Sequence, residues 1–158
     1  METEYAGREV ITDGSHLQNG QLKPNVVFVS GEYGYIYETN EQGLITRARA
    51  AALQLTADPK RPWHNPKTPG KRVGDHAGHL IAALFGGSGK LDNLTSQLAN
   101  INKSEYYAME RQIEQGLHDG LPVTFDVEVL YEDGSARPVE YIAIYSIGDA
   151  HYKKTFEN

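Results

Sequence analysis

One stretch of the sequence, residues 78–117, restricts the possible folds more than any other. It begins with a short apolar run at residues 79–84, passes through a glycine loop, and continues with a second strand-like run at residues 94–99. Apolar residues at helical spacing then predict a helix from Lys103 to about Leu117. The order strand, strand, helix predicts a compact unit in which the first strand starts beside the start of the helix.

Alternating patterns on both sides of this unit predict antiparallel strands. Residues 26–50 are expected to form a β-hairpin region, and residues 122–147 a C-terminal β-hairpin around the turn 132–135. Residues 1–25 show no periodicity and are expected to form an N-terminal arm. Together these patterns predict an α+β fold with an antiparallel β-sheet, organised as one domain over residues 1–158.

Three tyrosines, Tyr33, Tyr35 and Tyr37, alternate along the first hairpin region. Side chains two residues apart in a strand share one face, so the three are expected to pack together in the core. Stacking on nucleic-acid bases is the alternative role for the same face.

Composition excludes several classes of protein. The chain contains no cysteine, so it has no disulfide framework, and any metal must bind through nitrogen and oxygen ligands. No run approaches the roughly 18 apolar residues of a membrane span. The first residues lack the basic flank and apolar stretch of a classical signal peptide.

Positive charge is concentrated in the middle of an acidic chain. The formal net charge is −6, yet residues 44–75 carry seven basic and only two acidic side chains. Four prolines mix with these basic residues over residues 59–72 and predict a long loop, in which Arg61 and Lys71 are candidate contacts to a polyanion. Lys103 is a further candidate contact at the helix start.

Residues that can perform phosphodiester chemistry fall in the same strand–strand–helix stretch. His79 starts the first expected strand and Asn102 precedes the helix, so both can face one cleft. An imidazole can activate a water molecule, and an amide oxygen can help to hold a divalent cation against a phosphate. This combination is typical of a one-metal phosphodiesterase.

An ordered series of residues resembles the DNA/RNA non-specific endonucleases of the His-Me finger (ββα-metal) superfamily. The series is Gly78-His79-Leu80-Ile81, the glycine loop 86–89, Asn93, Gln97, Asn102-Lys103, Tyr106 and Glu110. The resemblance covers roughly residues 73–111. The run from Ala77 to Gly87 also looks like the nuclease toxin domains of bacterial secreted effectors.

The resemblance implies a ββα-metal finger over residues 75–118 and a role for each matching residue. His79 matches the general base, and Asn93 the asparagine that pins the finger and orients the imidazole. Asn102 matches the metal ligand, and Glu110 an acidic residue that holds metal-bound water. The implied cofactor is Mg²⁺, or another divalent cation such as Mn²⁺.

The chain departs from the commoner motif just before His79. That motif has Asp three residues before the histidine and Arg two before; here those positions hold His76 and Ala77. Asp75, one residue further upstream, is the candidate for the acidic position near the metal. Arg72 is the candidate for the phosphate contact that the absent arginine would make.

The resemblance also implies partners and a location. It implies hydrolysis of DNA, with RNA as a second substrate, and a cognate immunity protein that protects the producing cell. It implies secretion as the C-terminal toxin domain of a larger effector that acts in the cytoplasm of a target cell.

Other interpretations of the same residues remain open at this point. Asn102 with Glu105 has the spacing of a helix capping box, which would be a structural role. His76 and His79 could pair with His64 or His118 in a zinc site. A non-catalytic nucleic-acid- or protein-binding module on the same scaffold is the alternative to an enzyme.

Overall fold

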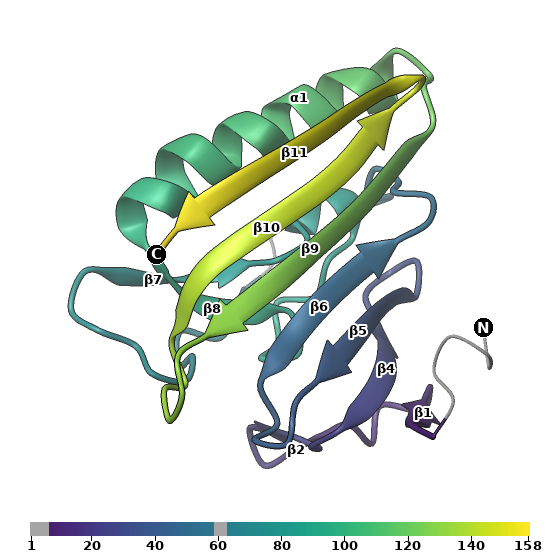
Figure 1. Ribbon diagram of the computed structural model, residues 1–158. Coiled ribbons are helices and arrows are strands. Elements are labelled where there is room, and N and C mark those ends of the chain that lie inside the picture. Colours follow the sequence, from purple (N-terminus) through teal and green to yellow (C-terminus); the bar gives the residue numbers. More distant parts are fainter. Residues whose placement is uncertain (1–6, 59–62) are drawn as a thin grey trace.

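The computed structural model describes residues 7–58 and 63–158, and its main element is a seven-stranded sheet (Figure 1). The strands follow the order β1-β4-β5-β6-β9-β10-β11 across the sheet. Neighbouring strands are antiparallel, except that β1 runs parallel to β4. The strands are β1 Glu9–Ile11, β4 Val26–Ser30, β5 Tyr35–Thr39, β6 Ile45–Ala50, β9 Val123–Tyr131, β10 Pro138–Ile147 and β11 Ala150–Glu157.

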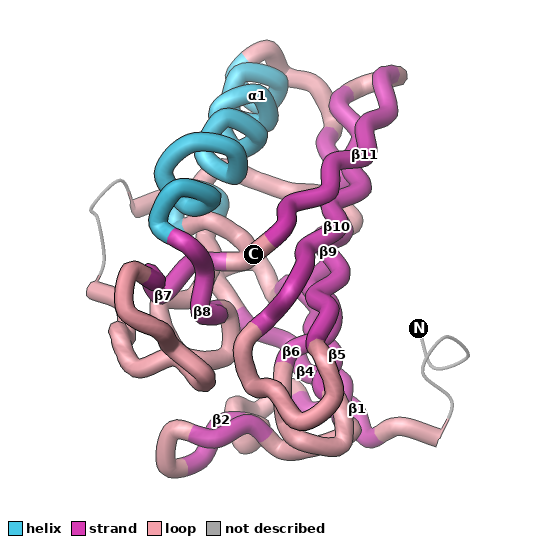
Figure 2. The backbone as a smooth tube through the Cα atoms, turned by 60° about the vertical axis from the view of Figure 1, so that its left-hand side comes forward, coloured by secondary structure: helices cyan, strands magenta, loops and turns pink. Residues whose placement is uncertain are grey.

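One helix, α1 (Tyr106–His118), packs against one face of this sheet, as Figure 2 shows with β9, β10 and β11 nearly edge-on. Met109 and Ile113 of α1 are fully buried in a core that they share with Val127 and Ala143 of the sheet. Along β9 buried and exposed side chains alternate, so this strand has one buried and one exposed face. The fold belongs to the α+β class, as the sequence predicts.

The strand–strand–helix stretch forms a separate unit, which we call the ββα unit. Its strands β7 (Asp75–His79) and β8 (Leu94–Leu98) pair antiparallel in a sheet of their own. A 3₁₀ turn, η1 (Ala83–Phe85), lies between them, and a π-helical turn, η2 (Ile101–Glu105), leads into α1. The predicted second strand and helix are therefore confirmed to within a few residues.

The first strand of the unit lies earlier than the sequence suggests. It was expected over residues 79–84, but it ends at His79. Beyond that point the backbone bonds to Asn93 instead of continuing the ladder, because Leu80 N–H donates to the Asn93 carbonyl (2.9 Å) and Ile81 N–H to its side-chain oxygen (3.1 Å). Leu80 and Ile81 of the apolar run are thus buried in a turn rather than in a strand.

The first hairpin region, residues 26–50, needs one correction, at Tyr33. Its hairpin is formed by β5 and β6, which pair antiparallel, and β4 precedes them in the same sheet. Gly31 and Gly34 adopt positive φ and turn the chain between β4 and β5. Tyr33 lies in that turn and is half-buried, while Tyr35 and Tyr37 are buried in the core as expected.

The ends of the chain also contain strands that the pattern does not reveal. The predicted arm includes β1 and the short pair β2 (Leu17–Gln18) and β3 (Gln21–Leu22). The predicted C-terminal hairpin, β9 and β10, is confirmed, and β11 extends it by pairing with β10.

Candidate active site

The start of β7 lies beside the start of the helical segment, as expected, but His76 rather than His79 occupies that position. Nδ2 of Asn102, in η2, lies 3.1 Å from Nδ1 of His76. Since an amide nitrogen only donates, His76 Nδ1 accepts this bond, and Asn102 Oδ1 is turned to another direction. His76 takes this position because β7 begins at Asp75, which places His79 at the other end of the strand.

Asn102 does not cap the helix. The helical segment begins at Ile101, so Asn100 occupies the N-cap position, and it makes no side-chain capping hydrogen bond. The capping-box interpretation of Asn102 and Glu105 is therefore wrong. The amide of Asn102 is used in the contact with His76 instead.

His79 ends β7 and lies against the proline-rich loop. Its half-buried ring contacts the ring of His64, edge to face, with 5.2 Å between the centroids. The backbone N–H of Asn65 donates to the Gly89 carbonyl (2.9 Å), which joins this loop to the glycine loop of the ββα unit. Sequence reasoning considered His64 only as a zinc ligand and missed its position beside His79.

Asn93 fixes the turn that follows His79. It is fully buried, and its Nδ2 donates to the carbonyls of Ile81 and Ser88, both at 2.8 Å. Its Oδ1 accepts from Ile81 N–H and from the Tyr37 hydroxyl (2.7 Å), which links the unit to the large sheet. Asn93 lies too deep to contact a substrate, so its part in the site is to position other residues.

Glu110 lies in α1, eight residues after Asn102, in a narrow apolar recess. Leu80, Ile81 and Phe85 are among the residues that line it. Desolvation by these neighbours raises the pKa of Glu110 to about 8. No hydrogen bond or ion pair joins its carboxyl group to another residue in the described part of the chain, so a nearby cation would offset the cost of its burial.

Asp75 is held in a structural ion pair. The guanidinium of Arg137 donates to both carboxylate oxygens, Nε to Oδ2 at 2.8 Å and Nη2 to Oδ1 at 2.9 Å, and both side chains are buried. This pairing, together with a bond from the Arg72 backbone N–H, holds the pKa of Asp75 below its usual value. With its oxygens engaged in this way, Asp75 has no place in the metal site that we consider below.

Arg72 lies at the opposite end of β7 from His79. Its exposed side chain lines a shallow cavity of about 110 Å³ together with Glu132, Ser135 and Arg137. From Asp75 to His79 the strand rises about 13 Å, at ~3.3 Å per residue. This position does not favour Arg72 as the replacement for the absent motif arginine.

The other candidate nucleic-acid contacts are exposed where they are described. Lys103 lies in η2 next to Asn102, and Lys71 donates from Nζ to the Pro66 carbonyl at 2.8 Å. Arg61 lies outside the described residues.

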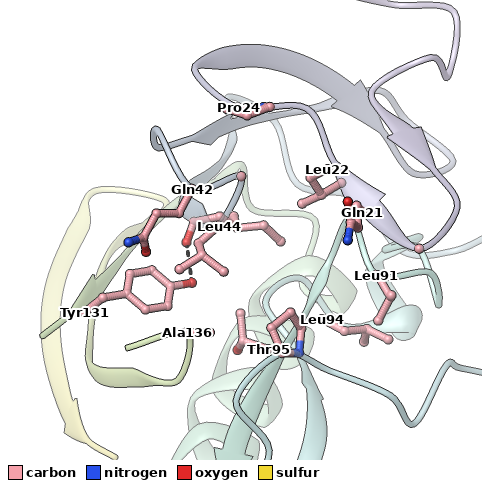
Figure 3. Close-up of a pocket in the computed structure, with 14 residues that line it drawn as sticks. Gln21, Leu22, Pro24, Gln42, Leu44, Leu91, Leu94, Thr95, Tyr131 and Ala136 are labelled. Atoms are coloured by element: carbon pink, nitrogen blue, oxygen red, sulfur yellow. Dashed lines mark hydrogen bonds between the residues drawn. The ribbon is translucent and has the colours of Figure 1, made fainter. Parts of the chain in front are cut away.

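A separate groove of about 410 Å³ lies between the β2–β3 pair, the β5–β6 turn and the start of β8 (Figure 3). Leu22, Leu44 and Leu94 line it, and at its edge the Tyr131 hydroxyl donates to the Ile45 carbonyl at 2.8 Å. None of the candidate catalytic or metal-binding residues contributes to this groove. The candidate site is therefore the surface around β7, η2 and the proline-rich loop.

This chain is similar in sequence to a known family of proteins. The family of DNA/RNA non-specific endonucleases matches residues 24–149, a range that contains the whole ββα unit. The chain belongs to this family. The resemblance inferred from the motif series is thereby confirmed.

Two relatives of this endonuclease-family chain are bacterial proteins of much greater length. The type VII secretion system protein EssD of Staphylococcus aureus (strain USA300) is 33% identical over 142 residues, which are 84% of this chain and 23% of EssD. The probable deoxyribonuclease RhsA of Dickeya dadantii (strain 3937) is 29% identical over 85 residues, which are 53% of this chain and 6% of RhsA. The chain thus spans less than a quarter of the length of either relative.

The described part of this endonuclease-family chain contains no ligand cluster that would support a zinc site. Within residues 7–58 and 63–158, no three His, Asp or Glu side chains are grouped closely enough to hold a metal ion. His118 lies at the end of α1, where it is exposed and 3.6 Å from Glu114. In the same described ranges, no helix has the length and apolar character needed to cross a membrane.

Proposed function

We propose that this chain is a metal-dependent endonuclease that hydrolyses phosphodiester bonds of DNA, with RNA as a second substrate. The observation that carries the proposal is the family match, which spans the ββα unit together with His79, Asn93, Asn102 and Glu110. The relative named as a probable deoxyribonuclease supports DNA as the first substrate.

In this proposal His79 is the general base. Its half-buried ring is held at the end of β7, where Asn93 fixes the following turn and His64 packs against the imidazole. A neutral imidazole in this place accepts a proton from the water that attacks the phosphorus, and a positioned base of this kind contributes ~10²–10⁴-fold in rate. The leaving group is then the 3′-oxygen, and the product carries a 5′-phosphate.

Asn102 is the residue that would hold a divalent cation directly, and Glu110 would hold water bound to that cation. Both offer oxygen atoms, which suit Mg²⁺ or Mn²⁺, and the carboxyl group of Glu110 is desolvated and unpaired within the described chain. When bound there, a divalent cation would supply positive charge against the phosphate and the departing oxygen. His76 fixes the amide of Asn102 so that Oδ1, the atom suited to a cation, is not consumed by the hydrogen bond between them.

Positive side chains of the central segment would dock the nucleic-acid backbone. Lys71 precedes β7 and Lys103 lies in η2, and both are exposed; Arg61 belongs to the basic segment of the sequence that contains Lys71. Contacts of this kind fix the position of the strand without reading its sequence, which suits a non-specific nuclease.

The relatives also suggest a biological setting. EssD is named as a type VII secretion system protein, and this chain aligns with 23% of its length. We therefore propose that the chain is the toxin domain of a larger secreted effector, that it acts in the cytoplasm of a target cell, and that an immunity protein inhibits it in the producing cell.

A plasmid-nicking assay tests the enzymatic proposal. The wild-type chain should convert supercoiled plasmid to nicked and linear forms with Mg²⁺ and should stop when EDTA is added. His79→Ala should lose ~10²–10⁴-fold in rate. His118→Ala is the matched control, because this exposed histidine lies at the far end of α1 and should keep its activity.

Single variants also distinguish the proposed role of His79 as the base from the proposed role of His76 in orienting Asn102. His76→Ala should reach the wild-type maximal rate when the Mg²⁺ concentration is raised. The substitution removes the group that orients Asn102, which weakens cation binding, but it leaves proton transfer at His79 intact. A folded, fully active His79→Ala protein would refute the assignment of the base. Binding of DNA without any cleavage under these conditions would instead favour a non-catalytic binding module.

A further inference from the structure

The only tryptophan of the chain, Trp63, is exposed to solvent beside the candidate active site. The side chain is 74% exposed, whereas Phe28, Tyr37 and Tyr141 are completely buried in the core. Tryptophan buries a large apolar area when it packs, so an indole exposed at a candidate functional surface is available to stack on a ligand.

The backbone of Trp63 is held close to the ββα unit. A side chain at Gly89 would have its Cβ only 2.4 Å from the Trp63 carbonyl oxygen, which shows how closely the two backbones approach. His64, the next residue, packs on His79, and Asn65 bonds to Gly89. Neighbouring Cα atoms are about 3.8 Å apart, so the backbone of Trp63 adjoins the residue whose ring contacts the candidate base.

The rest of the described loop is joined to β8 in the same way. The hydroxyl of Thr68 pairs with that of Ser96 at 2.7 Å, and Ser96 Oγ donates to the Pro69 carbonyl at 2.7 Å. Both Thr68 and Ser96 are buried. The indole is therefore presented from a loop that is fixed at several points to the ββα unit.

Charge around Trp63 favours a nucleic-acid partner. Residues 63–71 contain Lys67 and Lys71 and no acidic residue, in a chain whose net charge is −6. An aromatic face with positive side chains nearby is the combination that binds single-stranded nucleic acid, in which bases stack on the ring and phosphates meet the cations.

We propose that Trp63 forms a stacking site for an unpaired nucleobase next to the phosphate that is cleaved at His79. This inference rests on the proposed function, because it takes the nucleic-acid strand at His79 as given. Every base has a π-face, so such a site tolerates any sequence. A base within a duplex is already stacked on both sides, so the site favours single-stranded, frayed or nicked substrate.

The single tryptophan makes the test direct, since all indole fluorescence comes from this site. We would titrate the full chain in EDTA with a single-stranded oligothymidylate of eight nucleotides and follow tryptophan fluorescence. Stacking should quench the emission. A series of such oligonucleotides, each lacking the base at a different position, locates the stacked base. Quenching of tryptophan emission should be lost when the missing base is the one that stacks on Trp63.

Variants then measure the contribution of the indole to affinity. Trp63→Ala should weaken binding of the labelled oligonucleotide, followed by fluorescence anisotropy, by roughly 5- to 150-fold. Trp63→Phe should restore most of the affinity because it retains a ring. Ile144→Ala is the matched control, since Ile144 is an exposed apolar residue of β10, outside the site, and its removal should change nothing.

These measurements test the stacking site independently of the plasmid-cleavage assay. Unquenched fluorescence, unchanged affinity in Trp63→Ala, or equal affinity for a fully paired duplex would overturn the stacking site even if the plasmid is cleaved. Quenching and weaker binding in Trp63→Ala would support it even if the plasmid assay fails, in which case only the enzymatic proposal is lost.

Discussion

At the scale of single residues, the side chain of Asn93 joins three segments of the chain through four hydrogen bonds. Its amide satisfies two carbonyls and accepts from two donors, and these partners come from β5, the turn after His79 and the glycine loop. Gly87 must remain a glycine in the same place, because a Cβ there would lie 1.8 Å from the Ile81 carbonyl oxygen. One buried amide thus determines the path of the chain after the candidate base.

We expect Asn93→Ala to lower the free energy of unfolding by about 3 kcal/mol or more, since each buried polar group left without a partner costs ~1–3 kcal/mol. Urea denaturation followed by circular dichroism measures this change. Asn100→Ala is the control, because Asn100 is exposed and makes no side-chain capping bond. A loss below 1 kcal/mol in Asn93→Ala would mean that water or a rearranged turn replaces the amide.

Sequence reasoning can propose candidate site residues from local order, and it misses contacts that depend on the tertiary fold. Asn93 was identified from its place in the motif series, and its pinning bonds agree with that expectation. Arg137 was not considered, because its partner Asp75 is 62 residues away in the chain and no local pattern links them. The contact of His64 with His79 was missed for the same reason.

At the scale of elements, periodicity predicts a helix better than it predicts the ends of a strand. The helical spacing of Tyr106, Met109 and Ile113 is the spacing of the buried face of α1. The apolar run after His79 resembles a strand in sequence, because a buried turn and a buried strand can contain the same apolar residues. β11 was missed because its exposed, charged residues hide the alternation that pairing with β10 produces.

The packing of α1 on the sheet depends on a small residue at one contact. A Cβ at Gly116 would lie 2.4 Å from Cγ2 of Ile147, at the end of β10. In a helix interior Ala is otherwise more favourable than Gly by about 1 kcal/mol. We therefore expect Gly116→Ala to destabilise the wild-type chain by ~1 kcal/mol, because overpacking costs ~1–3 kcal/mol and exceeds the gain in helix propensity.

The sign of this effect should reverse once the contact is removed. In an Ile147→Ala background, Gly116→Ala should stabilise the chain by up to ~1 kcal/mol, measured by a double-mutant cycle in urea. Ala108→Gly, at an exposed position of α1, serves as the control and should cost ~1 kcal/mol in both backgrounds. Equal effects of Gly116→Ala in the two backgrounds would place the constraint elsewhere.

At the scale of the whole molecule, two sheets that share no strand are joined by polar contacts. Asp75 begins β7, and Arg137 directly precedes β10 of the large sheet. Arg137 also donates from Nη1 to the Asn158 carbonyl (2.6 Å), and the Asn158 side chain bonds to Ser96 of β8 at 2.9 Å. These contacts attach β7 and β8 of the ββα unit to the large sheet, on which α1 packs.

The Asp75–Arg137 pair gives stability that depends on pH. The ion pair lowers the pKa of Asp75 in the folded chain, below the value of ~3.9 for an unfolded aspartate. Its stabilisation is therefore complete above about pH 5 and is lost as the pH falls through the folded-state pKa. Asp75→Asn should cost ~3 kcal/mol at pH 7, because it leaves the buried guanidinium without its counter-charge.

Urea denaturation of wild type and Asp75→Asn between pH 2.5 and 7 measures this dependence, with the pH limits chosen to bracket the aspartate value of ~3.9. The difference in unfolding free energy should be constant at the upper end and should shrink below about pH 4, as protonation removes the charge from the wild type as well. Glu9→Gln is the control, since the Glu9–Lys23 pair (2.7 Å) is exposed and should contribute only ~0–1 kcal/mol at any pH. A difference that stays constant down to the lowest pH would show that Asp75 stabilises the junction by packing and hydrogen bonding rather than by its charge.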